Sequence, residues 1–466
     1  MELKHADEYL EKIGWGKYSW KVFFQCGFVI YIQAWSNDNL WNNNIAYILA
    51  GSRVEWELTG IESGVLGSAY ALGLLCGGFI FGIIGDKFGR MYSFKTTVLV
   101  ALISSLTLTF SMNLYMSSGA LLLIGLGMGG ELCLAGTVFC EFCPPSKMHY
   151  LTTMAIFWGI GSTFTAIVAY IITLKNTTEY HEWRIIVGIS CIYELICFVF
   201  RLFMLETPAY CLSQGRVEDA ENVLNTISLQ NTGEPFYLDS SLKNKITGSF
   251  CSRDNIKPKS GTFVLIRKLF QGYNLKLCLI FCIMYISAGF PFTSILYFMP
   301  TLLGNISQST AYGIIILQQA CGIPGVFIGS WLVDTRFGRK FTITLSFALA
   351  SLCCFFFYIG KNIILIIITT SIMNMFVIMG YSAMFTITPE SFPIEVRNIG
   401  SGFVNGCSRF VSIVCPIITG WLLDQDNGFP IAVIIFAILF GLCAISAFPL
   451  KETRPLPLKK GYLLNA

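Results

Sequence analysis

Two runs, GIIGDKFGR at residues 82–90 and GSWLVDTRFGR at residues 329–339, decide how this chain folds. Each follows an apolar stretch and places an aspartate and a Gly-Arg pair in a short polar turn. The two aspartates, Asp86 and Asp334, are 334 − 86 = 248 residues apart. A motif that recurs at a fixed offset indicates an internally repeated fold.

Two further motif pairs repeat at nearly the same offset. A Glu-x-x-Pro motif occurs at residues 141–144 and 390–393, and 390 − 141 = 249. A Glu-Thr pair followed by proline occurs at residues 206–208 and 452–455, and 452 − 206 = 246. Motif pairs at one common offset predict two halves of the same topology, related by an axis along the membrane normal.

The composition predicts that these halves lie in a membrane. Hydrophobic residues make up 54% of the 466 residues and charged residues only 12%, whereas soluble domains carry about 25% charged residues. About 20 apolar residues cross a bilayer, and a backbone inside lipid must satisfy its own polar groups, which favours helices. We therefore expect an all-α membrane protein with twelve transmembrane helices in two pseudo-symmetric six-helix halves. The expected spans are residues 22–49, 63–84, 93–112, 116–140, 151–174, 184–204, 275–303, 310–332, 341–359, 363–386, 399–423 and 429–448.

Glycines recur at short intervals in the second expected span. Gly73, Gly77, Gly78 and Gly82 lie within one helical stretch. Small residues allow membrane helices to approach closely, because no side chain separates their backbones. We expect these glycines to mark helix-packing positions.

The basic residues of the loops predict the orientation, because cytosolic loops carry an excess of Lys and Arg. The loops on one side carry Lys87, Arg90, Lys95, Lys147, Arg336, Arg339, Lys340 and Arg397, and those on the other side carry Arg53, Lys175, Arg184 and Lys361. Eight against four places the first set, and both termini, in the cytosol. The membrane itself is left open, as the plasma membrane or an internal vesicle or organelle membrane.

The chain is expected to divide into four segments. Residues 1–204 form the N-terminal six-helix half and residues 275–448 the C-terminal half. Residues 205–274 form a polar cytosolic linker, in which residues 217–227 have the pattern of a short amphipathic helix. Residues 449–466 form a cytosolic tail.

Several classes of function are disfavoured by the composition. The net charge of +4 is small and dispersed along the chain, whereas nucleic-acid binding would require a dense basic patch. Most of the 17 cysteines lie in apolar runs, with only three histidines to partner them at a metal site. We find no nucleotide-binding loop and no catalytic Ser/His/Asp arrangement. We therefore expect neither an enzyme nor a cofactor-binding or metal-binding protein, and active transport would draw on an ion gradient or on exchange.

The motifs resemble the major facilitator superfamily, and within it the branch of synaptic-vesicle-glycoprotein-2-related proteins and organic-ion or sugar porters. The Asp-Lys-x-Gly-Arg loop, the run PESFPIEVR at residues 389–397 and the glycines at residues 125–130 carry the resemblance. Three departures stand out: Thr335 is inserted in the second loop, Ala209 replaces a frequent arginine, and the first-half PxxxR run lacks its arginine.

The resemblance implies that the repeated loops gate the cytosolic side, latching the two halves together in the outward-open state. A carboxylate can bind free N–H groups at a helix N-terminus, and an arginine can hold a carboxylate bidentately. The alternative is that these charges only set topology. The implied gating residues are Gly82, Asp86, Arg90, Glu141, Asp334, Arg339, Glu390 and Arg397.

Three ionisable residues lie deep in expected spans: Asp38, Glu131 and Arg409. An Arg or Asp at the centre of a membrane helix costs about 2.5–3.5 kcal/mol, so each needs a partner or a wet cavity. An acid of one half could pair with Arg409 of the other half in one state and separate in another, taking up a proton or a cationic solute. The alternative is a permanent structural pair, or an arginine bonded to backbone carbonyls.

The resemblance also places spans one, four, seven and ten around a central cavity, which Asp38 and Glu131 would face. Asn42, Asn374, Tyr285 and Tyr381 are then further candidates for contact with a solute or for coupling, with core packing as the alternative for the tyrosines. Glu194 and Arg201 lie toward one end of span six and are interpreted as structural.

Two functions remain open. The first is a secondary active transporter, a symporter or exchanger that moves a small organic solute by alternating access and is coupled to protons or to exchange. The second is a transporter-like receptor or a structural subunit of a membrane complex, without a transport cycle. The expected partners are a small-molecule solute, protons and the lipid bilayer, with no nucleic acid.

Overall fold

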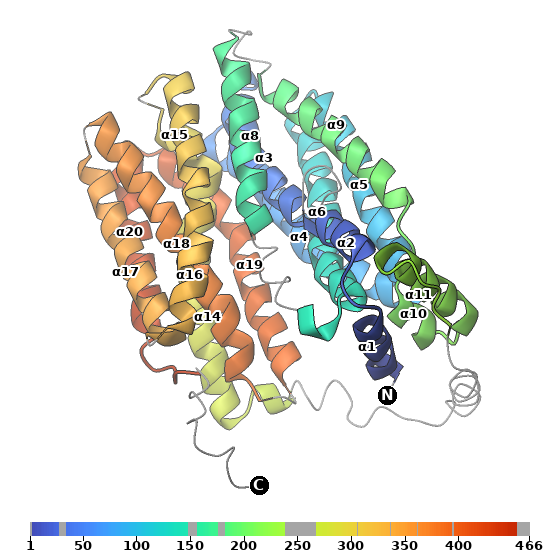
Figure 1. The fold of residues 1–466 in the computed structure, drawn as a ribbon. Helices are drawn as coiled ribbons and strands as arrows, with labels where there is room; N and C mark the ends of the chain where they lie inside the picture. Colours follow the sequence, from blue (N-terminus) through green and yellow to red (C-terminus); the bar gives the residue numbers. More distant parts are fainter. Residues whose placement is uncertain are drawn as a thin grey trace. The chain divides into compact units, whose positions relative to one another are not determined.

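The computed structural model describes residues 2–27, 34–147, 156–175, 182–237, 267–304, 306–335, 337–360, 362–393 and 396–453. Every regular element in these ranges is a helix (Figure 1). Eleven spans in them are long and apolar enough to cross a membrane. They are formed by α4 (Gly60–Phe88), α5 (Arg90–Thr109), α6 (Leu114–Phe142), α8 (Ile156–Leu174), α9 (Glu182–Leu202), α14 (Gly272–Leu302), α15 (Gln308–Ala320) with α16 (Gly322–Asp334), α17 (Gly338–Ile359), α18 (Ile363–Ser391), α19 (Arg397–Leu423) and α20 (Gly428–Ser446). The predicted all-α membrane architecture is confirmed.

The first expected span differs in its limits from the structure. Residues 17–27 form α2 (Lys17–Gly27) and residues 34–55 form α3 (Ala34–Glu55), with residues 28–33 outside the described ranges. The predicted end at residue 49 was wrong because the polar end of α3 has partners. Arg53 Nη2 lies 2.5 Å from Asp424 Oδ1, and Glu55 Oε1 lies 2.7 Å from Arg184 Nη2. These pairs keep the last turn of α3 helical although its side chains are charged.

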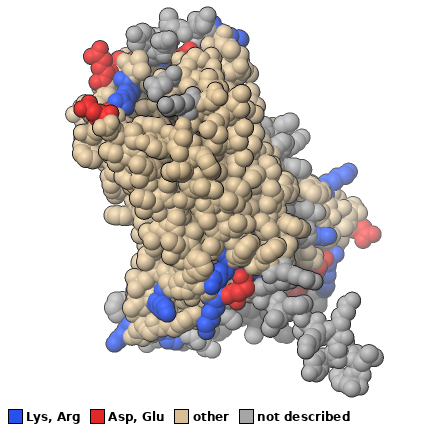
Figure 2. Space-filling view, turned by 90° about the vertical axis from the view of Figure 1, so that its left-hand side faces the viewer, with Lys and Arg blue, Asp and Glu red and all other residues tan. Residues whose placement is uncertain are grey.

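The outer surface of the helices is suited to lipid. Large hydrophobic side chains are exposed along them, with Phe79 68% and Ile103 58% exposed. Figure 2 shows charged side chains gathered toward the two ends of the face drawn, with a belt of uncharged residues between them. An exposed apolar belt bounded by charges is expected where lipid replaces water.

Contacts between helices group the chain into two compact units. Unit one comprises Met1–Lys259, Phe292–Ala320 and Arg409–Ala432, and unit two comprises Ser260–Pro291, Cys321–Ser408 and Val433–Ala466. Helices α14, α19 and α20 therefore contribute residues to both units.

Helices α4 and α6 of unit one pack with their backbones in close contact. A Cβ atom added to Gly73 would lie 2.1 Å from Leu122 O, and one added to Gly77 would lie 2.0 Å from Leu126 O. A Cβ atom added to Gly125 of α6 would likewise lie 2.1 Å from Tyr70 O of the α4 backbone. The packing role predicted for Gly73 and Gly77 is confirmed. Gly78 and Gly82 have only ordinary van der Waals neighbours, at 3.6 and 3.8 Å.

Four short helices pack together at one end of unit one: α1 (Glu2–Ile13), α2, α10 (Pro208–Ser213) and α11 (Val217–Asn231) (Figure 1). Leu10 and Ile13 share an apolar cluster with Leu224 and Ile227. Asn231 joins the helices because its Oδ1 accepts from Tyr18 N at 2.8 Å and its Nδ2 donates to Gly14 O at 3.0 Å. The predicted helix at residues 217–227 is confirmed and extends to Asn231. Residues 238–266 of the expected linker lie outside the described ranges.

The α4–α6 contact predicts a strong effect of a single methyl group. We expect Gly125→Ala to lower the apparent melting temperature of the purified protein, because overpacking a tight contact costs about 1–3 kcal/mol. Gly136→Ala on the same helix is the matched control, since a Cβ there meets nothing within 4 Å. It should leave the melting temperature unchanged or raise it slightly. Equal melting curves for the two variants would contradict the close packing of α4 against α6 at Gly125.

Candidate functional site

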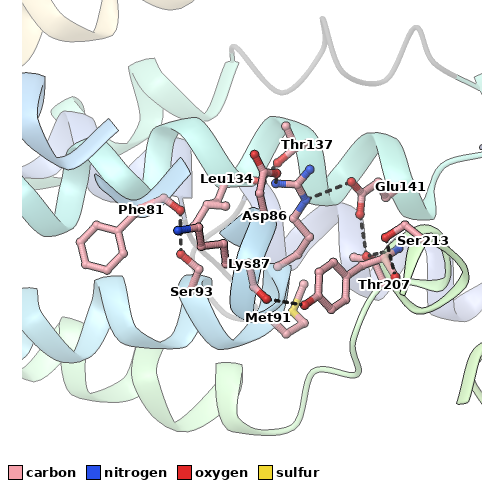
Figure 3. Close-up of polar contacts among 12 residues, drawn as sticks. Phe81, Asp86, Lys87, Met91, Ser93, Leu134, Thr137, Glu141, Thr207 and Ser213 are labelled. Atoms are coloured by element: carbon pink, nitrogen blue, oxygen red, sulfur yellow. Dashed lines mark hydrogen bonds and ion pairs between the residues drawn. The ribbon is translucent and has the colours of Figure 1, made fainter. Parts of the chain in front are cut away.

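A charge cluster surrounds the turn between α4 and α5 (Figure 3). Arg90 Nη1 lies 2.6 Å from Asp86 Oδ1, and Arg90 Nε donates to Glu141 Oε1 at 3.1 Å. Thr207 Oγ1 donates to the other Glu141 oxygen, Oε2, at 2.5 Å. The Arg90 guanidinium therefore joins the end of α4 to the end of α6, and Thr207 joins that pair to the segment after α9.

Glu206 caps the start of α5 in the same cluster. Its carboxylate oxygens accept from Met91 N at 3.1 and 3.2 Å, where the helix presents free N–H groups and a positive dipole end. Gly89 has φ +117°, and a Cβ there would lie 2.5 Å from Glu206 Oε2, so only glycine fits this turn. Tyr210 OH donates to Lys87 O at 3.1 Å, and burial, aided by the Glu206 charge, raises the pKa of Tyr210.

The corresponding turn of unit two repeats these contacts. Arg339 Nε and Nη2 each donate to Glu390 at 3.1 Å, in a bidentate pair. Glu452 accepts from the backbone N–H of Arg339 at 2.9 Å and of Lys340 at 3.0 Å. Thr453 Oγ1 donates to Glu390, as Thr207 does to Glu141. The sequence repeat thus recurs in three kinds of contact: an arginine bound to a glutamate, a second glutamate at the start of the next helix, and a threonine bound to the first glutamate.

The predicted gating residues are placed unevenly by the structure. Asp86, Arg90 and Glu141 meet in one cluster, and Arg339 and Glu390 meet in the other. Gly82 lies one turn before Asp86 on α4, with only ordinary contacts. The side chains of Asp334 and Arg397 lie outside the described residues. Sequence reasoning did not assign the capping role of Glu206 and Glu452, although the third motif pair already pointed to these two residues.

The polar side chains of α3 make a second, buried cluster in unit one. Asn39 Nδ2 donates to Trp158 O at 2.6 Å, and Asn44 Nδ2 donates to Ser190 Oγ at 2.8 Å. Two others both donate to the α3 backbone and accept from other helices: Gln319 Nε2 donates to Asn43 Oδ1 at 2.8 Å, and Tyr297 OH donates to Asn42 Oδ1 at 3.3 Å. These bonds explain how a helix so rich in asparagine can lie buried among apolar helices.

Glu131 of α6 is fully buried and pairs with Arg201 of α9, which is 1% exposed. Asn37 Nδ2 donates to the other Glu131 oxygen, Oε2, at 3.1 Å. Arg201 Nη1 also donates to Phe94 O at 3.0 Å, and its guanidinium lies 3.7 Å from the centroid of the Phe94 ring. In this structure the partner of Glu131 is therefore Arg201 of the same unit and not Arg409. Arg201 was overlooked as a partner because it lies near one end of its span.

Asp38 is fully buried, and neither carboxylate oxygen has a hydrogen-bond partner among the described residues. The positive charge of Arg409 on α19 acts on this carboxylate, and the indole N–H of Trp158 on α8 lies near it. The Trp158 indole N–H and the nearby Tyr70 hydroxyl are also buried without a hydrogen-bond partner in the described part of the chain. An acid, a base and two donors thus gather in unit one, with no hydrogen bond of ordinary geometry to the Asp38 carboxylate.

The remaining predicted site residues lie in unit two. Tyr285 OH lies 3.3 Å from Thr388 Oγ1, and Tyr381 makes an edge contact with the Phe347 ring. Asn374 is buried on α18. Unit one therefore brings together Asp38, Asn42, Glu131 and Arg409, whereas unit two holds Asn374, Tyr285 and Tyr381.

Comparisons with known proteins extend over nearly the whole chain. The niacin transporter NiaP of Acinetobacter baylyi is 24% identical over 452 residues, covering 96% of this chain and 97% of that protein. The synaptic vesicle 2-related protein of Pongo abelii is 24% identical over 471 residues, covering 95% of this chain and 79% of that protein. The partially occluded inward-open structure of the xylose transporter XylE from E. coli has the same fold, with a TM-score of 0.72 at 17% identity over 95% of this chain and 100% of that one.

The family model described as "Sugar (and other) transporter" matches residues 17–461. The predicted resemblance to the major facilitator superfamily, and to relatives of the synaptic vesicle protein, is confirmed. The chain is a multi-pass membrane protein and belongs to the sugar (and other) transporter family.

Proposed function

We propose that the chain is a secondary active transporter that moves a small organic solute by alternating access, with coupling to protons or to exchange. The observation that carries the proposal is the fully buried Asp38 carboxylate without a hydrogen-bond partner in the described residues. Removing a carboxylate from water costs several kcal/mol unless a partner compensates. A solute group or a proton would supply that partner.

The surroundings of Asp38 fit a small polar solute. Trp158 Nε1 and Tyr70 OH could each donate a hydrogen bond, and the nearby Arg409 could balance a negative group. The asparagine amides of α3 carry both donors and acceptors, and a solute would bind Asn42 by replacing its present partners, Asp38 O and Tyr297 OH. Named relatives support a small organic solute, since one is a niacin transporter and another an organic cation/carnitine transporter. A site that contains both an acidic side chain, Asp38, and a basic one, Arg409, can bind a solute of either charge.

The two turn clusters would act as gates in the cycle. Asp86 is 68% exposed although it binds Arg90 at 2.6 Å, so part of its carboxylate is available for other contacts. A helix end held by Glu206 or Glu452 is a rigid element that can move as one body. We propose that both clusters lie on the cytosolic side, as the loop charges predict, and bias the equilibrium between conformations. A scaffold without a transport cycle would require neither the gates nor the unpaired Asp38.

The gating role predicts that Asp86→Asn slows uptake with little effect on stability, whereas Glu141→Gln lowers stability. An exposed pair such as Asp86–Arg90 contributes only about 0–1 kcal/mol to stability, so Asp86→Asn should melt close to the parent. Its net uptake should nevertheless slow while the affinity for solute is kept, because the change acts on the conformational equilibrium. Glu141→Gln breaks the junction of Arg90 and Thr207 and should lower the melting temperature. Parental uptake by Asp86→Asn would argue against a gate.

The Asp38 site predicts loss of function without loss of stability. Asp38→Asn removes a buried charge that accepts no hydrogen bond from the described residues, so the melting temperature should stay the same or rise. Uptake into proteoliposomes, screened over small organic acids, bases and sugars, should fall by at least about tenfold, equivalent to the loss of roughly 1.4 kcal/mol of favourable interaction. Asp426→Asn is the matched control, because it makes the same chemical change on an exposed residue of unit one. Unchanged uptake by Asp38→Asn would refute the site.

A further inference from the structure

A third buried acid, Glu194 of α9, lies beside the Glu131–Arg201 pair and was interpreted from the sequence as structural. Its side chain is fully buried, and Trp41 Nε1 donates to its Oε1 at 2.6 Å. Its Oε2 has no hydrogen-bond partner in the described part of the chain, and the same holds for Arg201 Nε. Glu194 and the Arg201 guanidinium therefore each keep one polar atom available.

The charges around Glu194 do not balance if every acid is ionised. Arg201 is committed to Glu131, and Arg409 lies near Asp38. An ionised Glu194 would be a buried negative charge beside another carboxylate, with the neutral Trp41 indole N–H as its hydrogen-bond donor and the neutral Asn37 amide nearby. Such a charge costs several kcal/mol inside a protein, whereas a neutral carboxylic acid does not. The geometry favours a Glu194 that carries a proton.

The elements packed against Glu194 supply few other charges. Glu131 of α6 and Arg201 of α9 itself carry the charges that act on Glu194. The charge of Asp38 on α3 acts on Glu131. From α5 the Phe94 carbonyl and ring approach Arg201, and Lys95 lies at the end of α9 on Leu202 O at 3.1 Å. The described part of α8 contains no Asp, Glu, Lys or Arg.

Helix α3 connects this triad to the proposed solute site. Asn37 donates to Glu131 and Trp41 donates to Glu194, and Asp38 directly follows Asn37 in the chain. A solute that engages Asp38 and displaces α3 would therefore alter a hydrogen bond of both glutamates at once. No other helix in the described residues donates to both carboxylates through its side chains.

We propose that Glu194 is the exchangeable proton site of the transporter, in a triad whose Arg201 is shared between Glu131 and Glu194. On release, the Glu194 O–H bond breaks and the proton passes to water; the new carboxylate then accepts from Arg201, while Asn37 keeps its bond to Glu131. On uptake the steps reverse, so atoms and charge balance. The proposal rests on the transport function proposed above and names its coupling residue, in the role of a proton carrier rather than a solute ligand.

The first test needs no solute and so is independent of the transport proposal. Near neutral pH exposed carboxyl groups are ionised, so a carboxylic-acid carbonyl band in the infrared spectrum of the purified protein reports buried acids. We expect the spectrum of the parent to contain a band that Glu194→Gln lacks and that Asp426→Asn retains. Trp41→Phe, which removes one hydrogen bond and keeps every ionisable group, should shift the frequency of that band. A spectrum unchanged in Glu194→Gln, or in Trp41→Phe if the glutamine variant does not fold, would overturn the proposal.

The second test separates proton carriage from solute binding in proteoliposomes. Glu194→Gln should keep solute exchange at equal concentrations on both sides, but lose accumulation driven by a pH gradient. With one proton per solute, a gradient of one pH unit supports up to about tenfold accumulation, and the variant should fall to no accumulation. Asp38→Asn should lose exchange and accumulation together. Full pH-driven accumulation by Glu194→Gln would exclude this residue as the proton site, while leaving the transport proposal intact.

Discussion

The buried ion pair between Glu131 and Arg201 is the interaction on which the interior of unit one depends. Two opposite charges, both almost inaccessible, join α6 to α9 in a region surrounded by apolar helices. Breaking such a pair leaves an uncompensated charge, which costs about 3–5 kcal/mol. The pair also fixes what its neighbours can do. Because Arg201 is bound to Glu131, no cation among the described residues donates a hydrogen bond to Glu194, and Asp38 has Arg409 near it without a hydrogen bond, so these acids require a proton or a solute as a partner.

A different use of charge organises the helix ends. In both units an arginine holds a glutamate from a neighbouring helix, a second glutamate caps the following helix, and a threonine joins them. The carboxylates there neutralise free backbone N–H groups, so each turn becomes a rigid corner. Inside the helices Asp38 and Glu194 keep carboxylate oxygens without a hydrogen-bond partner in the described residues, whereas the glutamates at the turns are each bound by several donors. That contrast suits a molecule whose ends must stay rigid while its interior exchanges partners.

The sequence predicted the fold well because its main signals are local. Apolar runs and the motif offsets of 246 to 249 residues need no knowledge of packing, and they gave the spans and the repeat. Asp38 and Glu131 were identified because each is an ionisable residue deep in an expected span. Their partners were not, because which side chain faces Glu131 depends on how α6 and α9 pack, and no periodicity encodes that. The end of α3 was misplaced for the same reason, since the charged residues Arg53 and Glu55 in its last turn pair with residues far along the chain.

The central claim is that buried carboxylates couple the movement of solute to that of protons, and a direct measurement of proton movement tests it. Proteoliposomes in weakly buffered medium, with no imposed pH gradient, are given a transported solute on the outside, and external pH and uptake are recorded together. Inward symport predicts that the medium becomes more alkaline in proportion to the solute taken up, and that a protonophore abolishes the pH signal. Sustained solute uptake with no change in external pH would contradict the account.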